Sequence, residues 1–203
     1  WKVAASIVLI LAVLSLSMGL YFEKWKSEKK IVKTAKTQEK TFLLPDSSKV
    51  VLHHNSSVTY TKPLGNKREI DLKGEAYFEV EHDQKKPFIV YVDSSYVKVL
   101  GTKFVVSEYS SSKGVEVAVK SGRVELGSQN LGGGGRTIEQ LTSGTSIEIP
   151  VNKVGVQSSG SKPKISKEVN SDELLDWVQG KMIFRNTPLQ NVLADLENRY
   201  GVR

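Results

Sequence analysis

Cysteine is absent from this 203-residue sequence. The chain therefore forms no disulfide, binds no zinc or iron–sulfur cluster through thiolates, and has no thiol nucleophile. Histidine is scarce, with three residues. His53 and His54 are neighbours, so on a strand they would point to opposite faces and could not bind one metal ion together, and His82 stands alone. We predict neither a metal site nor a cofactor.

The common catalytic motifs are missing as well. No Ser-x-x-Lys, Gly-x-Ser-x-Gly, His-Glu-x-x-His or phosphate-loop pattern occurs. The four glycines at 132–135 are followed by a strand-like sequence rather than a helix, so we interpret them as a hairpin tip. Glu79 and Glu81 share a strand face, but such pairs are usually solvated. We predict a protein that is not an enzyme, and keep an enzyme using these two carboxylates as a third hypothesis.

Positive charge is concentrated in one short stretch. The formal net charge is +7, and residues 24–40, with seven lysines and two glutamates, hold +5 of it. The rest of the chain is therefore close to neutral, which argues against direct nucleic-acid binding. We interpret residues 23–40 as a basic juxtamembrane stalk, a solvated connector whose lysines meet anionic lipid head groups.

One long apolar run precedes this stalk. Residues 3–22 contain no charge, and twenty helical residues span roughly 30 Å, the thickness of a bilayer core. Trp1 lies at one end, and Tyr21, Phe22 and Trp25 form an aromatic belt at the other. A signal-peptide core is the alternative, but the run is longer than such cores and lacks an Ala-x-Ala site. We predict a transmembrane helix over residues 1–22.

Residues 41–150 have the pattern of an all-β domain. Short runs of β-branched and aromatic residues recur every 8–12 residues between Gly, Pro, Asp and Ser, without a helical period. Residues 88–92 are apolar on both faces, which indicates a covered strand, and Pro87 should start that strand or lie on an edge. The pattern does not separate a β-sandwich from a β-solenoid. The expected strands are 41–44, 49–53, 57–61, 67–72, 77–82, 88–92, 97–100, 104–106, 114–119, 122–126, 136–141 and 145–150.

The sequence changes character after residue 150. Residues 151–169 are rich in Ser, Gly, Lys and Val, which predicts a flexible linker. Residues 170–203 contain two helix starts, at Asn170 and at Thr187-Pro188, separated by a short strand at 181–185. The second helix has an apolar face that needs a sheet to cover it. We therefore expect a small α+β domain that is cut off at Arg203.

Three pieces of the central stretch resemble the FecR family. GEAYFEV, KPFIV and VKVLGTKFVV occur in the family's order and spacing, and TFLLPDSSKVVL resembles its opening, with Ser47-Ser48 in place of the usual Gly-Ser. Trp177-x-x-Gly180 and the segment around Phe184 resemble the C-terminal domain of many members, which is similar to the short N-terminal domain of secretins and TonB-dependent transporters. The signature positions are Gly74, Glu75, Tyr77, Phe78, Val80, Pro87, Phe88, Val99, Leu100, Gly101, Thr102, Phe104, Trp177, Gly180, Phe184, Pro188 and Leu189.

This resemblance implies a fold and a function. The fold would be a transmembrane helix, a short β-solenoid or twisted sandwich of antiparallel strands, and the start of a β-α-β domain. The protein would be an anti-sigma factor that regulates an extracytoplasmic-function sigma factor in response to an outer-membrane TonB-dependent transporter. A segment before Trp1 would bind the sigma factor, and the β domain would sense the signalling domain of the transporter.

The resemblance also implies a location, in the inner membrane with a single pass and the β domain in the periplasm. The lysines after residue 22 would by themselves favour the cytoplasm for this side, and here we follow the resemblance. The alternative function is a membrane-tethered ligand-binding module for glycans. Four tyrosines, Tyr77, Tyr91, Tyr96 and Tyr109, would then form a stacking platform.

Overall fold

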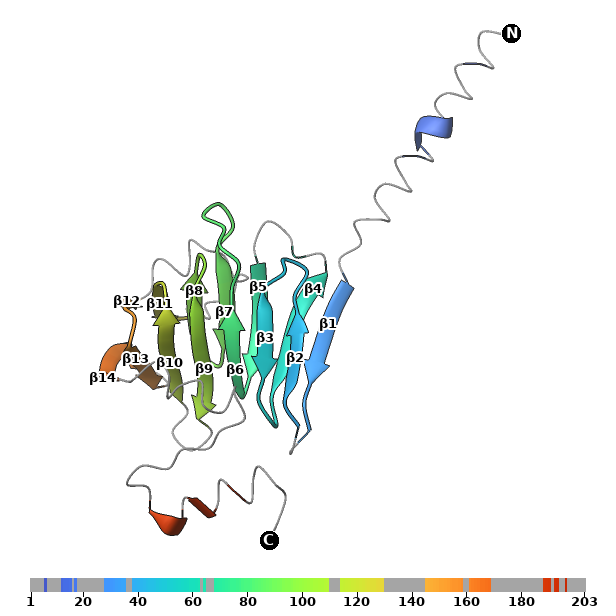
Figure 1. The fold of residues 1–203 in the computed structure, drawn as a ribbon. Helices are drawn as coiled ribbons and strands as arrows, with labels where there is room; N and C mark the ends of the chain where they lie inside the picture. The colour runs from blue at the N-terminus through green and yellow to red at the C-terminus, as the bar shows by residue number, and fades with distance from the viewer. Residues whose placement is uncertain are drawn as a thin grey trace.

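The computed structural model describes residues 28–35, 38–62, 64, 68–109, 114–129, 145–158 and 161–168, with isolated positions near both ends (6, 12–15, 17, 188–190, 192, 193 and 196). Two mainly antiparallel sheets of seven strands face each other (Figure 1). Sheet A is ordered β1 (Glu28–Lys33), β4 (Ser57–Lys62), β5 (Arg68–Lys73), β7 (Phe88–Val92), β8 (Ser95–Val99), β11 (Val124–Ser128), β12 (Ser146–Ile149). Sheet B is ordered β14 (Lys164–Glu168), β13 (Lys153–Ser158), β10 (Gly114–Ser121), β9 (Lys103–Tyr109), β6 (Glu75–Glu79), β3 (Lys49–Leu52), β2 (Lys40–Leu43).

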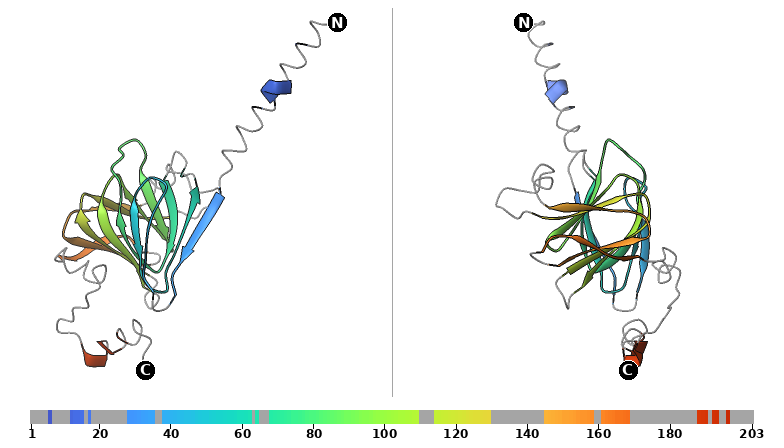
Figure 2. Two further views of the ribbon diagram at one scale, coloured as in Figure 1. Left: turned by 45° about the vertical axis from the view of Figure 1, so that its right-hand side comes forward. Right: turned by 90° about the vertical axis from the view of Figure 1, so that its left-hand side faces the viewer.

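The chain winds back and forth between the sheets as it moves along the molecule. Hairpins β2–β3, β9–β10 and β13–β14 belong to sheet B, and hairpins β4–β5, β7–β8 and β11–β12 belong to sheet A. The stack runs from β1 and β2 at one end to β12 and β14 at the other, and the right-hand view of Figure 2 looks along it. The two predicted alternatives are thus combined, because the layers form a sandwich while the hairpins succeed one another as in a solenoid.

A single strand explains the one exception to antiparallel pairing. Successive strands reverse direction, so strands an odd number of places apart in the chain run antiparallel. Of the twelve described strand pairs, eleven are of that kind, and β5–β7 is the exception. The chain enters sheet B between these two strands with β6 alone instead of a hairpin. Strands β5 and β7 therefore run parallel, in the register Arg68↔Phe88 to Leu72↔Val92.

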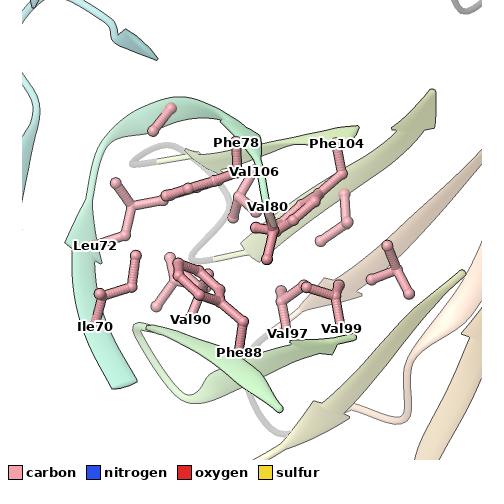
Figure 3. Packing of buried hydrophobic residues seen from close by; sticks show 14 of the residues in the cluster. Ile70, Leu72, Phe78, Val80, Phe88, Val90, Val97, Val99, Phe104 and Val106 are labelled. Atoms are coloured by element: carbon pink, nitrogen blue, oxygen red, sulfur yellow. The ribbon is translucent and has the colours of Figure 1, made fainter. Parts of the chain in front are cut away.

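The core lies between the sheets and is filled by alternate residues of nearly every strand. Phe78 of β6 is at its centre, with its ring centroid 5.2 Å from Phe104 and 6.1 Å from Phe88 (Figure 3). All three rings are fully buried. Each stabilises the fold by roughly 1.5 to 3 kcal/mol through removal of apolar surface from water. All five residues of β7 are buried, and the strand begins directly after Pro87, so both predictions for this strand are confirmed.

The two ends of the sandwich are closed differently. At the first end, Phe42 of β2 stacks on Tyr60 of β4, with centroids 6.5 Å apart across the sheets. At the other end, Gly155 of β13 faces Ile149 of β12, and a Cβ at Gly155 would overlap the Ile149 side chain. The sheets approach each other closely there, and a larger residue at 155 would require the buried Ile149 side chain to shift.

The β domain is larger at both ends than the sequence predicts. Residues 28–33 of the predicted stalk form β1, which pairs with β4, and residues 153–158 and 164–168 of the predicted linker form the hairpin β13–β14. At these residues the predictions of a connector and of a flexible linker are wrong, because the segments are paired strands. Their lysines are compatible with strand structure because β1 and β14 are edge strands, where lysine is common.

The predicted flanking elements lie mostly outside the described residues. This holds for the transmembrane helix, for the strand at 136–141, and for Trp177, Gly180 and Phe184. Within the described part of the chain, no helix has the length and apolar character needed to cross a membrane. Pro188 and Leu189 are described, and the Leu189 side chain is exposed.

Candidate functional site

The signature side chains of the strands form the core. Phe78, Val80, Phe88, Val99 and Phe104 point between the sheets and are at most 7% exposed. The fold needs apolar side chains at those strand positions, and because they are buried, none of them is available to a partner.

The signature glycines sit where a side chain does not fit. Gly74 has φ +86°, its N–H donates to the Glu108 carboxylate (2.9 Å), and a Cβ would overlap the Ser56 hydroxyl. A Cβ at Gly101 would lie 2.6 Å from the Cα of His82, which explains why glycine is needed there. The following Thr102 donates its hydroxyl to the Arg123 carbonyl (2.9 Å) and so ties two turns together.

Three signature turns meet around a buried arginine at one end of the strands. Arg68, the first residue of β5, is 3% exposed. Its Nη1 donates to the Asp46 carboxylate (3.1 Å) and the Glu81 carbonyl (2.7 Å), its Nε to the Lys86 carbonyl (2.8 Å), and its Nη2 to the Leu100 carbonyl (3.3 Å). The guanidinium also lies 5.6 Å from the Phe88 ring centroid.

This arginine holds together segments that are far apart in the sequence. Asp46 belongs to the turn after β2, Lys86 precedes β7 and Leu100 follows β8. Asp46 is held in turn by Ser48, whose hydroxyl donates to it at 2.7 Å and accepts from the Glu81 N–H at 3.1 Å. Arg68 and Asp46 also line a cleft of about 370 Å³ with Leu64, His82 and neighbouring residues.

Sequence reasoning missed Arg68. A basic residue at the start of a strand normally predicts solvent exposure, and its acceptors are mainly backbone carbonyls, which have no sequence signature. Its burial follows from three turns that converge only after the strands have paired. The only hint in the sequence was that Arg68 lies shortly before the Gly74-Glu75 motif, and this position does not indicate which residues it contacts.

A second group of polar residues gathers on the outer face of sheet B. His53 Nδ1 lies 3.3 Å from the Glu75 carboxylate, and His53 Nε2 lies 3.7 Å from the Glu39 carboxylate. Ser107 donates its hydroxyl to Glu75 at 3.0 Å. Glu116 is on the next strand, paired with Ser107 in register. We call Glu39, His53, Glu75 and Glu116 the His53 cluster.

Glu75 has the most perturbed carboxyl of the described residues. Its pKa is raised to about 7, mainly by loss of solvation and also by the negative charges of Glu116 and Glu39, against the hydrogen bond from Ser107. Glu75 therefore stays protonated to a higher pH in the folded protein than in the unfolded chain. No described group of three or more acidic, His or Cys side chains is arranged to hold a metal ion.

The two adjacent histidines are not arranged as predicted. Strand β3 ends at Leu52, so His53 and His54 lie in the turn that follows it. Their rings are side by side, with centroids 3.9 Å apart and His54 Nδ1 3.1 Å from His53 Nε2. The prediction of opposite faces is wrong because the alternation of a strand does not extend into the turn.

The tyrosines do not form a platform. Tyr77 lies on the outer face of sheet B, whereas Tyr91 and Tyr96 lie on the outer face of sheet A, and all three are at most 5% exposed. Tyr91 and Tyr96 donate their hydroxyls to Glu69 (3.3 Å) and Glu125 (2.8 Å). The Tyr109 side chain lies outside the described part. The predicted stacking platform is therefore wrong for the three described tyrosines.

The open sheet edges differ in how well they are protected. Within the described residues, β1 and β12 are the end strands of sheet A, and β2 and β14 those of sheet B. Strands β1 and β14 carry several lysines, which discourage the addition of another strand. Strand β2 has only Lys40, and Leu43 is 65% exposed. Because the Leu44 N–H points to Ser48, the backbone groups of Thr41 and Leu43 point away from β3.

Comparisons with known proteins agree with this description. Residues 30–125 match the family model for FecR protein. Two crystal structures of a candidate anti-sigma factor from Parabacteroides distasonis, at 2.50 and 1.65 Å resolution, are similar to this chain. The first is 26% identical with a TM-score of 0.69, covering 86% of this chain and 76% of that chain. The second is 26% identical with a TM-score of 0.68, covering 85% and 75%.

Among curated protein sequences, none matches this chain. The family match coincides with the part of the chain in which the signature glycines, the core side chains and Arg68 all have defined roles. The resemblance predicted from the three sequence motifs is confirmed. The chain thus carries a FecR domain, over residues 30–125.

Proposed function

We propose that this protein is a transmembrane signal transducer that acts as an anti-sigma factor on an extracytoplasmic-function sigma factor. The observation that carries the proposal is the similarity, at 26% identity over 86% of this chain, to the structures of a candidate anti-sigma factor. A binding role rather than a catalytic one fits the β domain. The Glu79 carboxylate, for example, pairs with Lys103 on the neighbouring strand.

The proposed arrangement places the β domain in the periplasm. Residues 3–22 would anchor the chain in the inner membrane, and a segment before Trp1 would bind the sigma factor in the cytoplasm. The apolar run supports the anchor because it is long enough to cross a bilayer as a helix. The β domain then serves as the sensing module for the signalling domain of a TonB-dependent transporter.

Strand addition at β2 is the contact that we propose for this sensing. Backbone hydrogen bonds to an added strand need no convergent catalytic side chains. The outward backbone groups of Thr41 and Leu43 and the exposed Leu43 side chain suit β2 to this contact, and the scarcity of lysine favours β2 over the edges β1 and β14.

Co-purification tests the regulatory role. Full-length protein, including the segment expected before Trp1, is expressed with each tagged extracytoplasmic-function sigma factor of the host. We expect one sigma factor to be recovered, and its recovery to be lost when the segment before Trp1 is deleted. Failure to recover any sigma factor would count against the proposal.

The membrane topology is tested separately by labelling. Because the chain has no cysteine, Lys85→Cys introduces a single thiol at an exposed position of the β domain. We expect an impermeant maleimide to label it once the outer membrane is permeabilised, without lysis of the inner membrane. Labelling that requires inner-membrane lysis would place the domain on the cytoplasmic side.

The β2 contact is tested with the isolated signalling domain of the transporter and the full-length protein. Leu43→Lys should weaken binding at least about fivefold, since it places a charge on the edge that accepts the strand. The matched control is Ile165→Lys on β14, which is 48% exposed and should leave binding unchanged. Equal effects of the two substitutions would exclude β2 as the docking edge.

A further inference from the structure

We propose that the His53 cluster is a pH-dependent contact that holds the connection between β1 and β2 on the outer face of sheet B. Glu39 lies at the end of this connection, immediately before β2. His53 lies in the turn after β3, Glu75 starts β6 and Glu116 is on β10. The cluster therefore joins the part of the chain that enters the domain to three strands of the sheet.

The geometry places one imidazole between two carboxylates. Its Nδ1 is 3.3 Å from Glu75 and its Nε2 is 3.7 Å from Glu39. The other charged or titratable groups around Glu75 are His54, whose ring contacts His53, Glu116 on β10, and Glu108, which binds the N–H of the preceding Gly74. The immediate surroundings of Glu75 thus contain three further carboxylates and two imidazoles.

Protonation decides whether this arrangement attracts or repels. When His53 is protonated, it can pair with the Glu39 carboxylate and, where Glu75 is ionised, with the Glu75 carboxylate as well. A protonated Glu75 does not repel Glu39 or Glu116. When His53 is neutral and Glu75 is ionised, the negative charges of Glu39 and Glu116 repel the Glu75 carboxylate. The cluster should therefore hold the connection between β1 and β2 more tightly at mildly acidic pH than at mildly alkaline pH.

Hydrogen bonds from backbone amides also join this connection to the turn after β3. The protection of these amides can therefore be used to detect loosening of the connection. The Thr34 N–H donates to the Ser56 carbonyl (3.0 Å), the Asn55 N–H to the Ala35 carbonyl (3.1 Å), and the Ser56 N–H to the Thr34 hydroxyl (2.9 Å). The Thr34 hydroxyl donates to the carbonyl of His53 itself at 2.6 Å. Loosening of the His53 cluster should expose these amides before the rest of the sheet opens.

Hydrogen exchange of the full-length protein tests this inference independently of any sigma factor. Protection of the amides at 34, 55 and 56, corrected for the intrinsic pH dependence of exchange, is compared between pH 5.5 and 8. The internal control is the pair of amides at 80 and 83, which donate to Thr102 and Leu100 at the Arg68 end. We expect the first group to lose about tenfold in protection at pH 8, with little change in the second.

Substitutions identify the group that causes the pH-dependent loss of protection. Glu75→Gln removes the titrating carboxylate and should reduce the pH-dependent loss to less than about twofold. Glu148→Gln, which removes an exposed carboxylate on β12, is the matched control and should keep the full loss. If Glu75→Gln fails to fold, Glu116→Gln should produce a smaller flattening of the same profile. Uniform loss of protection at both groups of amides, or an unchanged profile in the glutamine variants, would overturn the proposal.

Discussion

Arg68 shows how a single residue can depend on the whole fold. Its guanidinium satisfies three carbonyls and one carboxylate from turns that the sequence separates widely. An isolated buried charge would be strongly unfavourable, and only the complete set of acceptors makes it tolerable. The same acceptors would be left without a donor if the arginine were replaced.

Arg68→Met is therefore expected to lower the free energy of unfolding by about 3 to 5 kcal/mol, because it leaves the Asp46 carboxylate uncompensated and three carbonyls without a donor. Urea unfolding followed by circular dichroism measures this change. The control is Arg123→Met, because Arg123 is highly exposed and pairs with Glu148 at 3.4 Å. Its replacement should cost less than about 0.5 kcal/mol.

Ser47 occupies a backbone conformation that suits glycine. Its φ is +68°, at the position where the family usually has Gly in the turn after β2. We expect Ser47→Gly to raise the free energy of unfolding by about 0.5 to 1 kcal/mol, since the left-handed conformation costs a side-chain-bearing residue more than glycine. A decrease in stability in urea unfolding would show that the serine side chain makes a compensating contact.

Glu75 makes stability depend on pH. Its folded-state pKa, about 7, is above the unfolded value of 4.5. Its contribution is present below the unfolded value and is lost as pH rises through 7. We expect the wild type to lose about 1 to 2 kcal/mol between pH 5 and 8 relative to Glu75→Gln, because the carboxylate is still partly solvated. Parallel pH profiles of the two proteins in urea unfolding would contradict this.

At the scale of elements, whether a segment forms a strand depends more on the strands beside it than on its own composition. The lysine-rich segment at 28–33 has the composition of a solvated connector, yet it pairs with β4 along six residues. The segments at 153–158 and 164–168 similarly extend sheet B. An edge strand needs only one paired side and one apolar contact, so polar segments next to an existing sheet can be recruited to it.

Gly127 leaves room for an aromatic ring from the neighbouring strand. The ring of Tyr96 on β8 lies across Gly127 on β11, and a Cβ there would come within 2.5 Å of the ring. Because Tyr96 is fully buried and held by Glu125, it cannot move away freely. Gly127→Ala should destabilise the protein by about 1 to 3 kcal/mol in urea unfolding. A change below about 0.5 kcal/mol would mean that the ring can shift.

At the scale of the whole molecule, one continuous core joins the two sheets. The main cluster of buried side chains runs from Val58 near one end to Ile149 near the other without a gap that would divide the domain. The described β strands should therefore unfold as one cooperative unit. The cost of removing a ring should depend on its position along this core.

Phe78→Ala is expected to cost about 3 to 5 kcal/mol because it opens a cavity beside Phe104 and Phe88 at the centre. Phe42→Ala removes a partly buried ring at the β1–β2 end and should cost about half as much or less. Thermal unfolding by circular dichroism compares the two variants. Equal losses would indicate that the end of the sandwich is as tightly packed as its centre.

The sequence by itself indicated most of the strands between residues 40 and 128, and the alternation of polarity indicated which side chains of β6 are buried. Alternation at β6 and the doubly apolar β7 depend on neighbours one and two residues away, so they can be read locally. Pro87 marked the start of β7 for the same reason. The motifs around Gly74 and Gly101 were enough to indicate the family, because they reflect backbone constraints that no other residue meets.

Only the tertiary structure decided how these strands are combined. The passage of β6 alone into sheet B makes β5 and β7 parallel, and it also brings Glu75 beside His53. The burial of Arg68 and the pairing of β1 with β4 are decided at the same level. Each depends on contacts between residues far apart in the chain, and local patterns of polarity carry no information about which distant partner a residue will meet.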